Sequence, residues 1–170
     1  MTMNDVEEDI DRLLFAIPKK GRMFERVNEL LLGAGLHYRR PNRVDIAHLK
    51  QLPVTLVFLP AKDIAAYVAE GKVDLGITGQ DMVAEDGAVV NELELMGFGK
   101  CRLCLQAPIA DKITSAASLA GKRIVTSFPN LATKYFKAFE QESMKTKIKY
   151  VSGSVEAACG LVRAMSAIIS

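Results

Sequence analysis

Short apolar runs alternate with stretches of helical period along most of the chain. The runs of strand length are residues 13–17 (LLFAI), 54–59 (VTLVFL), 73–78 (VDLGIT), 101–107 (CRLCLQA), 122–127 (KRIVTS) and 147–151 (KIKYV). Buried parallel strands have continuous apolar sequences, whereas amphipathic helices repeat about every 3.6 residues. Strands that alternate with helices favour right-handed crossovers and a mostly parallel sheet covered on both faces. The pattern therefore predicts an α/β protein.

The predicted helices lie between these runs and carry apolar residues three or four positions apart. These positions are Phe24, Val27, Leu30 and Leu31 in the first helix, Ile64, Tyr67 and Val68 in the second, and Leu131, Tyr135, Ala138 and Phe139 in the fourth. A short third helix is expected over residues 79–86. A last helix is expected from Val155 through Cys159 and Val162, with Ile169 on the same apolar face.

The order of these elements divides the chain into two α/β lobes that meet near residues 92–98. We assign residues 1–11 to an acidic tail, 12–94 to the first lobe and 95–170 to the second. A length of 170 residues suits one domain or two small lobes, and such a chain needs neither disulfides nor a metal to fold.

Composition excludes several classes of protein. The chain is 49% hydrophobic and 25% charged, as ordinary globular proteins are, and its net charge of +2 is too small to predict a nucleic-acid partner. No apolar run approaches the roughly 20 residues of a membrane helix. The acidic N-terminus is unlike a signal peptide, and an odd number of cysteines, three, favours reduced thiols in the cytoplasm.

Candidate chemistry lies in the loops that follow strands, because ligands of open α/β sheets bind at the carboxyl ends of strands. Lys19, Lys20, Gly21 and Arg22, hereafter the basic loop, separate the first strand from the first helix. Two ammonium groups and a guanidinium around a glycine suit a phosphorylated ligand. A solvated basic turn explains these residues equally well.

Two further loops have weaker signals. Residues 126–130 contain hydroxyls that could contact phosphate, but N-capping by Ser127 or Asn130 is the favoured interpretation. Residues 152–154 precede Glu156, whose carboxylate could hold ribose hydroxyls or complement the helix dipole.

Several familiar motifs are absent from the sequence. No GxxxxGK[ST] or GxGxxG sequence occurs, which excludes a P-loop NTPase and the dinucleotide fingerprint. Cys101 and Cys104 have CxxC spacing, but no second pair follows, and buried thiols are favoured over a metal site. The cluster of Arg39, Arg40 and Arg43 is expected to be a solvated face, with a phosphate or base contact as the alternative. Asp74 is expected to end its strand, and a ligand role is the less favoured interpretation.

Six segments occur in an order that resembles a known family. They are DRLLFAIPKKGRMFERVNELL, NRVDIAHL, VDLGITGQDMVAED, GFGKCRLCLQAP, LAGKRIVTSFPNLATKYF and VSGSVEAACG. Together they resemble the fungal type of ATP phosphoribosyltransferase, the first enzyme of histidine biosynthesis, over roughly residues 12–160.

The resemblance implies two α/β lobes around a cleft, like the type II periplasmic binding proteins. It also implies a cytoplasmic, homo-oligomeric enzyme that, with Mg²⁺, condenses ATP and 5-phosphoribosyl 1-pyrophosphate into N1-(5-phosphoribosyl)-ATP and pyrophosphate. The substrate-binding residues that it implies are Lys19, Lys20, Gly21, Arg22, Arg43, Thr78, Gly79, Ser154 and Glu156. It implies no protein metal site, and no side chain is assigned as catalytic.

The sequence departs from the family pattern after Gly160. The pattern runs from Glu156 through five residues to a Gly, an Asp and a Ser/Thr-Gly-x-Thr loop that holds the phosphoribosyl group, whereas Val162 replaces that Gly here. We therefore expect a truncated or divergent end, an incomplete second lobe, weak ATP binding and impaired turnover. The alternatives are a non-catalytic two-lobed nucleotide or small-molecule binder, and a subunit that pairs with a complete copy.

Overall fold

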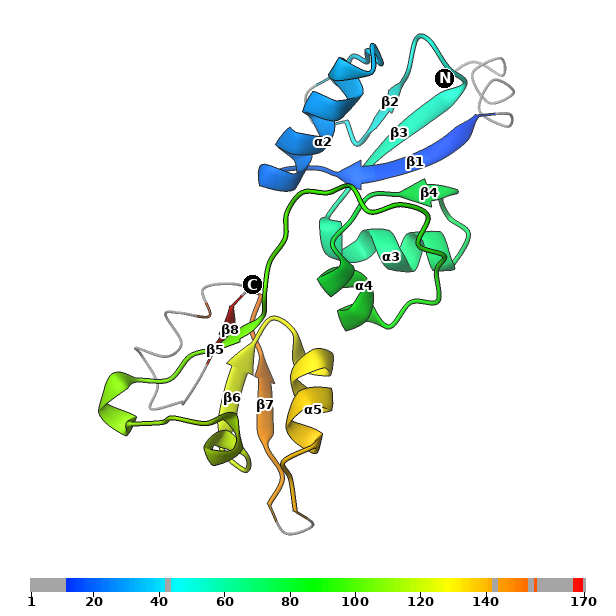
Figure 1. The fold of residues 1–170 in the computed structure, drawn as a ribbon. Helices are drawn as coiled ribbons and strands as arrows, with labels where there is room; N and C mark the ends of the chain where they lie inside the picture. Colours follow the sequence, from blue (N-terminus) through cyan, green and yellow to red (C-terminus); the bar gives the residue numbers. More distant parts are fainter. Residues whose placement is uncertain (1–11, 42–43, 142–143, 153–154, 156–166, 170) are drawn as a thin grey trace. The chain divides into compact units, whose positions relative to one another are not determined.

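A computed structural model describes residues 12–41, 44–141, 144–152, 155 and 167–169 (Figure 1). The chain divides into two compact units, Met1–Gly99 and Lys100–Ser170, each with its own sheet. Phe98 packs against the core of the first unit, so the residues up to Gly99 belong with that unit. Within the described ranges, none of the helices has the length and apolar character needed to cross a membrane.

The first unit is built on a four-stranded sheet in the order β2-β3-β1-β4. Its strands are β1 (Leu13–Pro18), β2 (Ile46–His48), β3 (Val54–Leu59) and β4 (Leu75–Gly76). β1 runs parallel to β3 along its whole length and parallel to β4 on its other side. β2 is an antiparallel edge strand beside β3. The carboxyl ends of β1, β3 and β4 therefore lie along one edge.

Helices cover both faces of this sheet, with α2 (Arg22–Gly33) on one and α3 (Ala61–Ala69) on the other (Figure 1). Successive side chains of a strand point to opposite faces, and β1 follows this rule. Ile17 packs in the cluster that includes α2, whereas Ala16 packs with Ile64 of α3. α4 (Gln80–Asp86) contacts α3. Burial on both faces explains why β1 and β3 have continuous apolar sequences.

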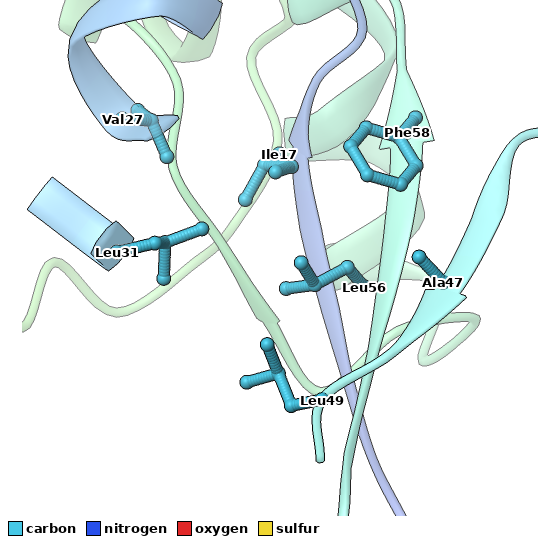
Figure 2. Close-up of a cluster of buried hydrophobic side chains, with 7 residues drawn as sticks. All are labelled: Ile17, Val27, Leu31, Ala47, Leu49, Leu56 and Phe58. Atoms are coloured by element: carbon cyan, nitrogen blue, oxygen red, sulfur yellow. The ribbon is translucent and has the colours of Figure 1, made fainter. Parts of the chain in front are cut away.

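The larger core cluster lies between α2 and the sheet. Figure 2 shows its buried members, which are Ile17, Val27, Leu31, Ala47, Leu49, Leu56 and Phe58. Val27 and Leu31 are one helical turn apart and point from α2 toward the strands. Phe58 is fully buried, and its ring contacts those of Phe24 and Tyr38, with centroids 6.3 and 5.7 Å away. This packing fixes α2 against the sheet.

The second unit has a sheet in the order β5-β8-β6-β7. Its strands are β5 (Cys104–Leu105), β6 (Arg123–Thr126), β7 (Lys147–Tyr150) and β8 (Ala167–Ile169), and two short 3₁₀ turns, Ile109–Asp111 and Ala116–Leu119, precede β6. β6 is parallel to β7 and β8, while β5 is antiparallel to β8. α5 (Pro129–Lys137) packs through Phe136 against Ile124 and Ile148. The predicted α/β class with mostly parallel sheets flanked by helices is confirmed.

Two strands of the first unit differ from the sequence prediction. The run 73–78 forms a strand only at Leu75–Gly76, where β4 lies at the edge of the sheet and pairs with β1 at two positions. Asp74 was predicted to end this strand, but it precedes it. Its Oδ2 accepts a hydrogen bond from the Leu14 amide (2.8 Å). β2 was not predicted, since three residues are too few to establish an alternation.

The end of the second unit also differs. Residues 167–169 form β8, between β5 and β6, rather than continuing the predicted last helix. Ile168 and Ile169 are β-branched and so favour a strand. Val155, where that helix was expected to begin, is helical and buried, whereas Cys159 and Val162 lie outside the described residues.

Candidate functional site

The carboxyl edge of the first sheet is where the topology of an open α/β sheet predicts a ligand site. The chain leaves β1 through the basic loop and enters α2 on one face of the sheet. It leaves β4 through residues 77–79 and enters α4, which contacts α3, the helix on the other face. Open α/β sheets bind ligands where neighbouring strands send their connections to opposite faces. Because Ala16 of β1 lies opposite Gly76 of β4, these two loops begin side by side.

The basic loop combines three cations with a glycine at the start of α2. Lys19 is half-buried, and Lys20 and Arg22 are exposed. Gly21 is the N-cap of α2, with φ 84° and ψ −178°, a conformation that is essentially restricted to glycine. The first amides of any α-helix have no intrahelical partner, and Gly21 has no side chain that could accept a hydrogen bond from those of α2. Amides and cations at one helix end suit an anionic ligand.

Thr78 and Gly79 lie beside the first turn of α2. Met23 reaches to within 3.8 Å of the position that a Cβ atom on Gly79 would take. That Cβ would also overlap Oδ1 of Asp81, so a larger residue at position 79 would displace the Asp81 carboxylate. The Thr78 hydroxyl donates to the carbonyl of Ala61 (2.6 Å), which leaves its oxygen able to accept from a ligand.

The structure thus brings six of the predicted site residues to one edge, namely Lys19, Lys20, Gly21, Arg22, Thr78 and Gly79. Arg43, Ser154 and Glu156 lie outside the described residues. The assignment of all nine to substrate binding stays a prediction.

Arg40 belongs to this edge but was not among the predicted site residues, and the favoured prediction of a solvated arginine face does not hold for it. Its side chain is only 25% exposed, and its guanidinium donates to the carbonyl of Lys19 (3.2 Å) in the basic loop. The sequence gives no sign of this contact, because Arg40 lies in a polar stretch and its partner is a backbone carbonyl 21 residues away. Arg39 is exposed, as predicted.

Tyr38 contributes no negative charge to the first unit. Its hydroxyl donates to Oδ1 of Asn28 (2.7 Å). Burial raises the pKa of the Tyr38 hydroxyl above its usual value, against a smaller opposing effect of the Arg40 charge. Tyr38 is therefore a neutral hydrogen-bond donor at any physiological pH.

The loop after β6 does not have the predicted cap. The N-cap of α5 is Phe128, which has no capping side chain, rather than Ser127 or Asn130. Pro129 occupies the first turn, as predicted, and needs no capping acceptor because it has no amide hydrogen. The buried hydroxyl of Thr126 accepts a hydrogen bond from the Phe128 amide (2.9 Å), which fixes the start of the loop.

The CxxC pair is exposed, contrary to the predicted burial. Cys101 precedes the short strand β5 and Cys104 begins it, and both are free thiols. β5 is an edge strand of only two residues, too short to bury both positions. In the part of the chain that the structure describes, no group of three or more His, Cys, Asp or Glu side chains is placed to hold a metal ion.

Comparison with known proteins extends these observations. The family model described as "HisG: ATP phosphoribosyltransferase" matches residues 60–169, which includes residues beyond Gly160. ATP phosphoribosyltransferases of Candida glabrata and Saccharomyces cerevisiae are each 50% identical to this chain and align with 89% and 94% of it. The enzyme of Schizosaccharomyces pombe is 47% identical over 89% of the chain. These alignments cover 52%, 54% and 54% of the relatives, so the chain spans about half their length.

A solved structure shows the same fold. The ATP phosphoribosyl transferase (HisG:HisZ) complex from Thermotoga maritima contains a chain that superposes with a TM-score of 0.74 at 25% sequence identity. The match covers 92% of this chain and 72% of that one.

Proposed function

Because this chain belongs to the ATP phosphoribosyltransferase family, as its six motifs predicted, we propose that it serves the reaction of that family. In that reaction N1 of ATP attacks the anomeric carbon of 5-phosphoribosyl 1-pyrophosphate. The carbon–oxygen bond to pyrophosphate breaks, its electron pair leaves with pyrophosphate, and N1-(5-phosphoribosyl)-ATP forms, which is the first step of histidine biosynthesis. The observation that carries the proposal is the meeting of the basic loop with Thr78 and Gly79 at one sheet edge.

The chemistry of this edge suits the substrates. Both substrates are polyanions, so bringing them together requires cations and oriented amides. Lys20 and Arg22 are exposed and supply such charge, while the α2 amides supply donors in a fixed direction. Hydrogen bonds to charged groups contribute about 1.5–3 kcal/mol each, so a few of them hold a triphosphate. The purine is the nucleophile, so no cradle for γ-phosphate hydrolysis is needed.

Magnesium enters this proposal with the substrates. Mg²⁺ usually keeps several waters and is held by substrate phosphates and one or two carboxylates, not by a dedicated protein cage. No step assigned to this chain's side chains depends on the ion.

We also place the protein in the cytoplasm as a homo-oligomer. Two exposed free thiols, Cys101 and Cys104, suit a reducing compartment. Exposed apolar side chains on residues 89–96, among them Val89 and Leu93, are consistent with burial against further protein.

Calorimetric titration of the chain with MgATP tests the proposal, with Lys20→Met and Lys50→Met as a matched pair. Lys50 is also exposed, but it follows β2 at the opposite edge of the same sheet. We expect Lys20→Met to weaken ATP binding by about tenfold or more, and Lys50→Met to leave it unchanged.

A parent chain that binds neither ATP nor AMP would contradict the proposal and favour the alternative of a non-catalytic small-molecule binding protein. Equal losses in the two variants would refute the role of the basic loop. Formation of phosphoribosyl-ATP on addition of 5-phosphoribosyl 1-pyrophosphate would show that the chain also turns over.

A further inference from the structure

The guanidinium of Arg40 contacts two segments of the first unit, the basic loop and residues 44–45. Its Nη1 donates to the carbonyl oxygen of Lys19 (3.2 Å), and its Nε donates to that of Val44 (2.9 Å). Its Nη2 lies 2.9 Å from Oδ1 of Asp45, with which it forms an ion pair. Each nitrogen of the fork therefore has an acceptor, and the acceptors come from two separate parts of the chain.

The plane of this fork rests on the hydrophobic core. Its Cζ atom lies 3.9 Å from the centroid of the Phe58 ring. Phe58 is fully buried in β3, and its amide donates to the carbonyl of Asp45 (2.9 Å). A guanidinium that stacks on a fixed ring and donates from three nitrogens has one orientation, which a flexible ammonium does not reproduce.

Lys19 is consequently held through both of its backbone groups. Its amide donates to the carbonyl of Leu59 at the end of β3 (2.8 Å), and its carbonyl accepts from Arg40. The basic loop thus starts from a fixed peptide, and Gly21 then turns the chain into α2. The side chains of Lys20 and Arg22 remain exposed. The loop combines an anchored backbone with accessible cations.

We propose that Arg40 is a positioning residue, which fixes the backbone of the basic loop so that its cations and amides are preorganised for an anionic substrate. Asp45 compensates its charge and Phe58 covers one face of its guanidinium, so Arg40 acts through Lys19 and does not itself bind phosphate. That this substrate is ATP rests on the proposed function. Preorganisation raises affinity because the ordering of the loop is completed before the ligand binds.

Limited trypsin digestion measures the positioning directly, because the basic loop contains three cleavage sites. Cleavage after Lys20 and Arg22 is compared, by mass spectrometry, with cleavage after the exposed Lys112 in the second unit. We expect Arg40→Gln to speed loop cleavage by about tenfold while cleavage after Lys112 stays unchanged, since a hydrogen bond from a charged donor to the loop is lost.

Two further variants separate positioning from charge balance. Arg40→Lys keeps the charge and most of the stem but loses the fork, and we expect it to resemble Arg40→Gln. Asp45→Asn removes the ion pair and keeps the bond from Arg40 to Lys19, and we expect loop cleavage close to that of the parent. Thermal midpoints of all variants show whether any change is global.

The outcomes are distinct for the two proposals. Loop cleavage that is unchanged in Arg40→Gln, or restored in Arg40→Lys, overturns the positioning role, as does an equal effect of Asp45→Asn. MgATP affinity is measured in parallel, and we expect it to be lower in the variants whose basic loop is cleaved faster. A parent chain that does not bind ATP refutes the proposed function, whereas the cleavage rates still decide the role of Arg40.

Discussion

Replacement of Gly21 by alanine tests whether the backbone of the basic loop has the conformation described. At φ 84° and ψ −178°, a non-glycine residue is strained by about 1–3 kcal/mol. Nothing lies within 4 Å of the Cβ that alanine would add, so no clash increases this cost. Alanine also lowers the entropy of the unfolded chain, which offsets about 0.4–1 kcal/mol. We therefore expect Gly21→Ala to reduce the free energy of unfolding by about 1–2 kcal/mol.

The assay is urea unfolding followed by far-ultraviolet circular dichroism, together with MgATP titration. Gly87→Ala is the control, because Gly87 also has a positive φ, 77°, and open space around its Cβ but lies at the far end of α4. Both variants should lose stability, since alanine in the left-handed region costs about 1–2 kcal/mol. Only Gly21→Ala should weaken ATP binding. A Gly21→Ala chain with the stability and ATP affinity of the parent would refute the loop conformation.

Two other predictions concern the second unit and the core. The Thr146 amide donates to Oε1 of Glu140 (2.7 Å) and lowers the pKa of that carboxyl from its ordinary 4.5. The stability that this hydrogen bond contributes is present above pH 4.5 and is lost as the pH falls through the folded-state pKa. The free energy of unfolding of Glu140→Gln should therefore depend less on pH between pH 5 and 3. A variant whose free energy of unfolding has the same pH dependence as that of the parent would contradict this. Phe58→Ala should reduce the free energy of unfolding in urea by about 3–5 kcal/mol. Because it removes the ring under Arg40, it should also raise the rate of trypsin cleavage in the basic loop. A slower loop cleavage would contradict the stacking of Arg40 on Phe58.

The fold could be predicted wherever burial dictates residue type. β1 and β3 are covered on both faces, so their sequences are continuously apolar and their limits are clear. β4 and β5 were predicted too long because both are short strands at sheet edges, where pairing and not hydropathy sets the length. β8 was assigned to a helix because three residues carry no period.

The site could be predicted in part for a similar reason. The loop that follows β1 stands out because glycine and three cations occur together after a strand, and the topology then explains why Thr78 and Gly79 lie beside it. Arg40 could not be assigned in this way. Its partners are two carbonyls, a carboxylate and the face of a ring. Of these, only the ion pair with Asp45, five residues away, could be proposed from the sequence.

The thiols illustrate the opposite error. Cysteine is among the most buried residue types, which made burial of Cys101 and Cys104 the natural prediction. Both are exposed because β5 contributes only two residues at the edge of its sheet. An expectation drawn from residue type fails where the local element is too small to cover its side chains.

Hydrogen–deuterium exchange with and without MgATP tests most directly whether the carboxyl edge of the first sheet binds the nucleotide. We expect slower exchange in peptides that span residues 19–24 and 78–82, and no change in residues 48–53 at the opposite edge of the sheet. Slower exchange at residues 48–53, or unchanged exchange at the basic loop under saturating nucleotide, would contradict the assignment of this edge.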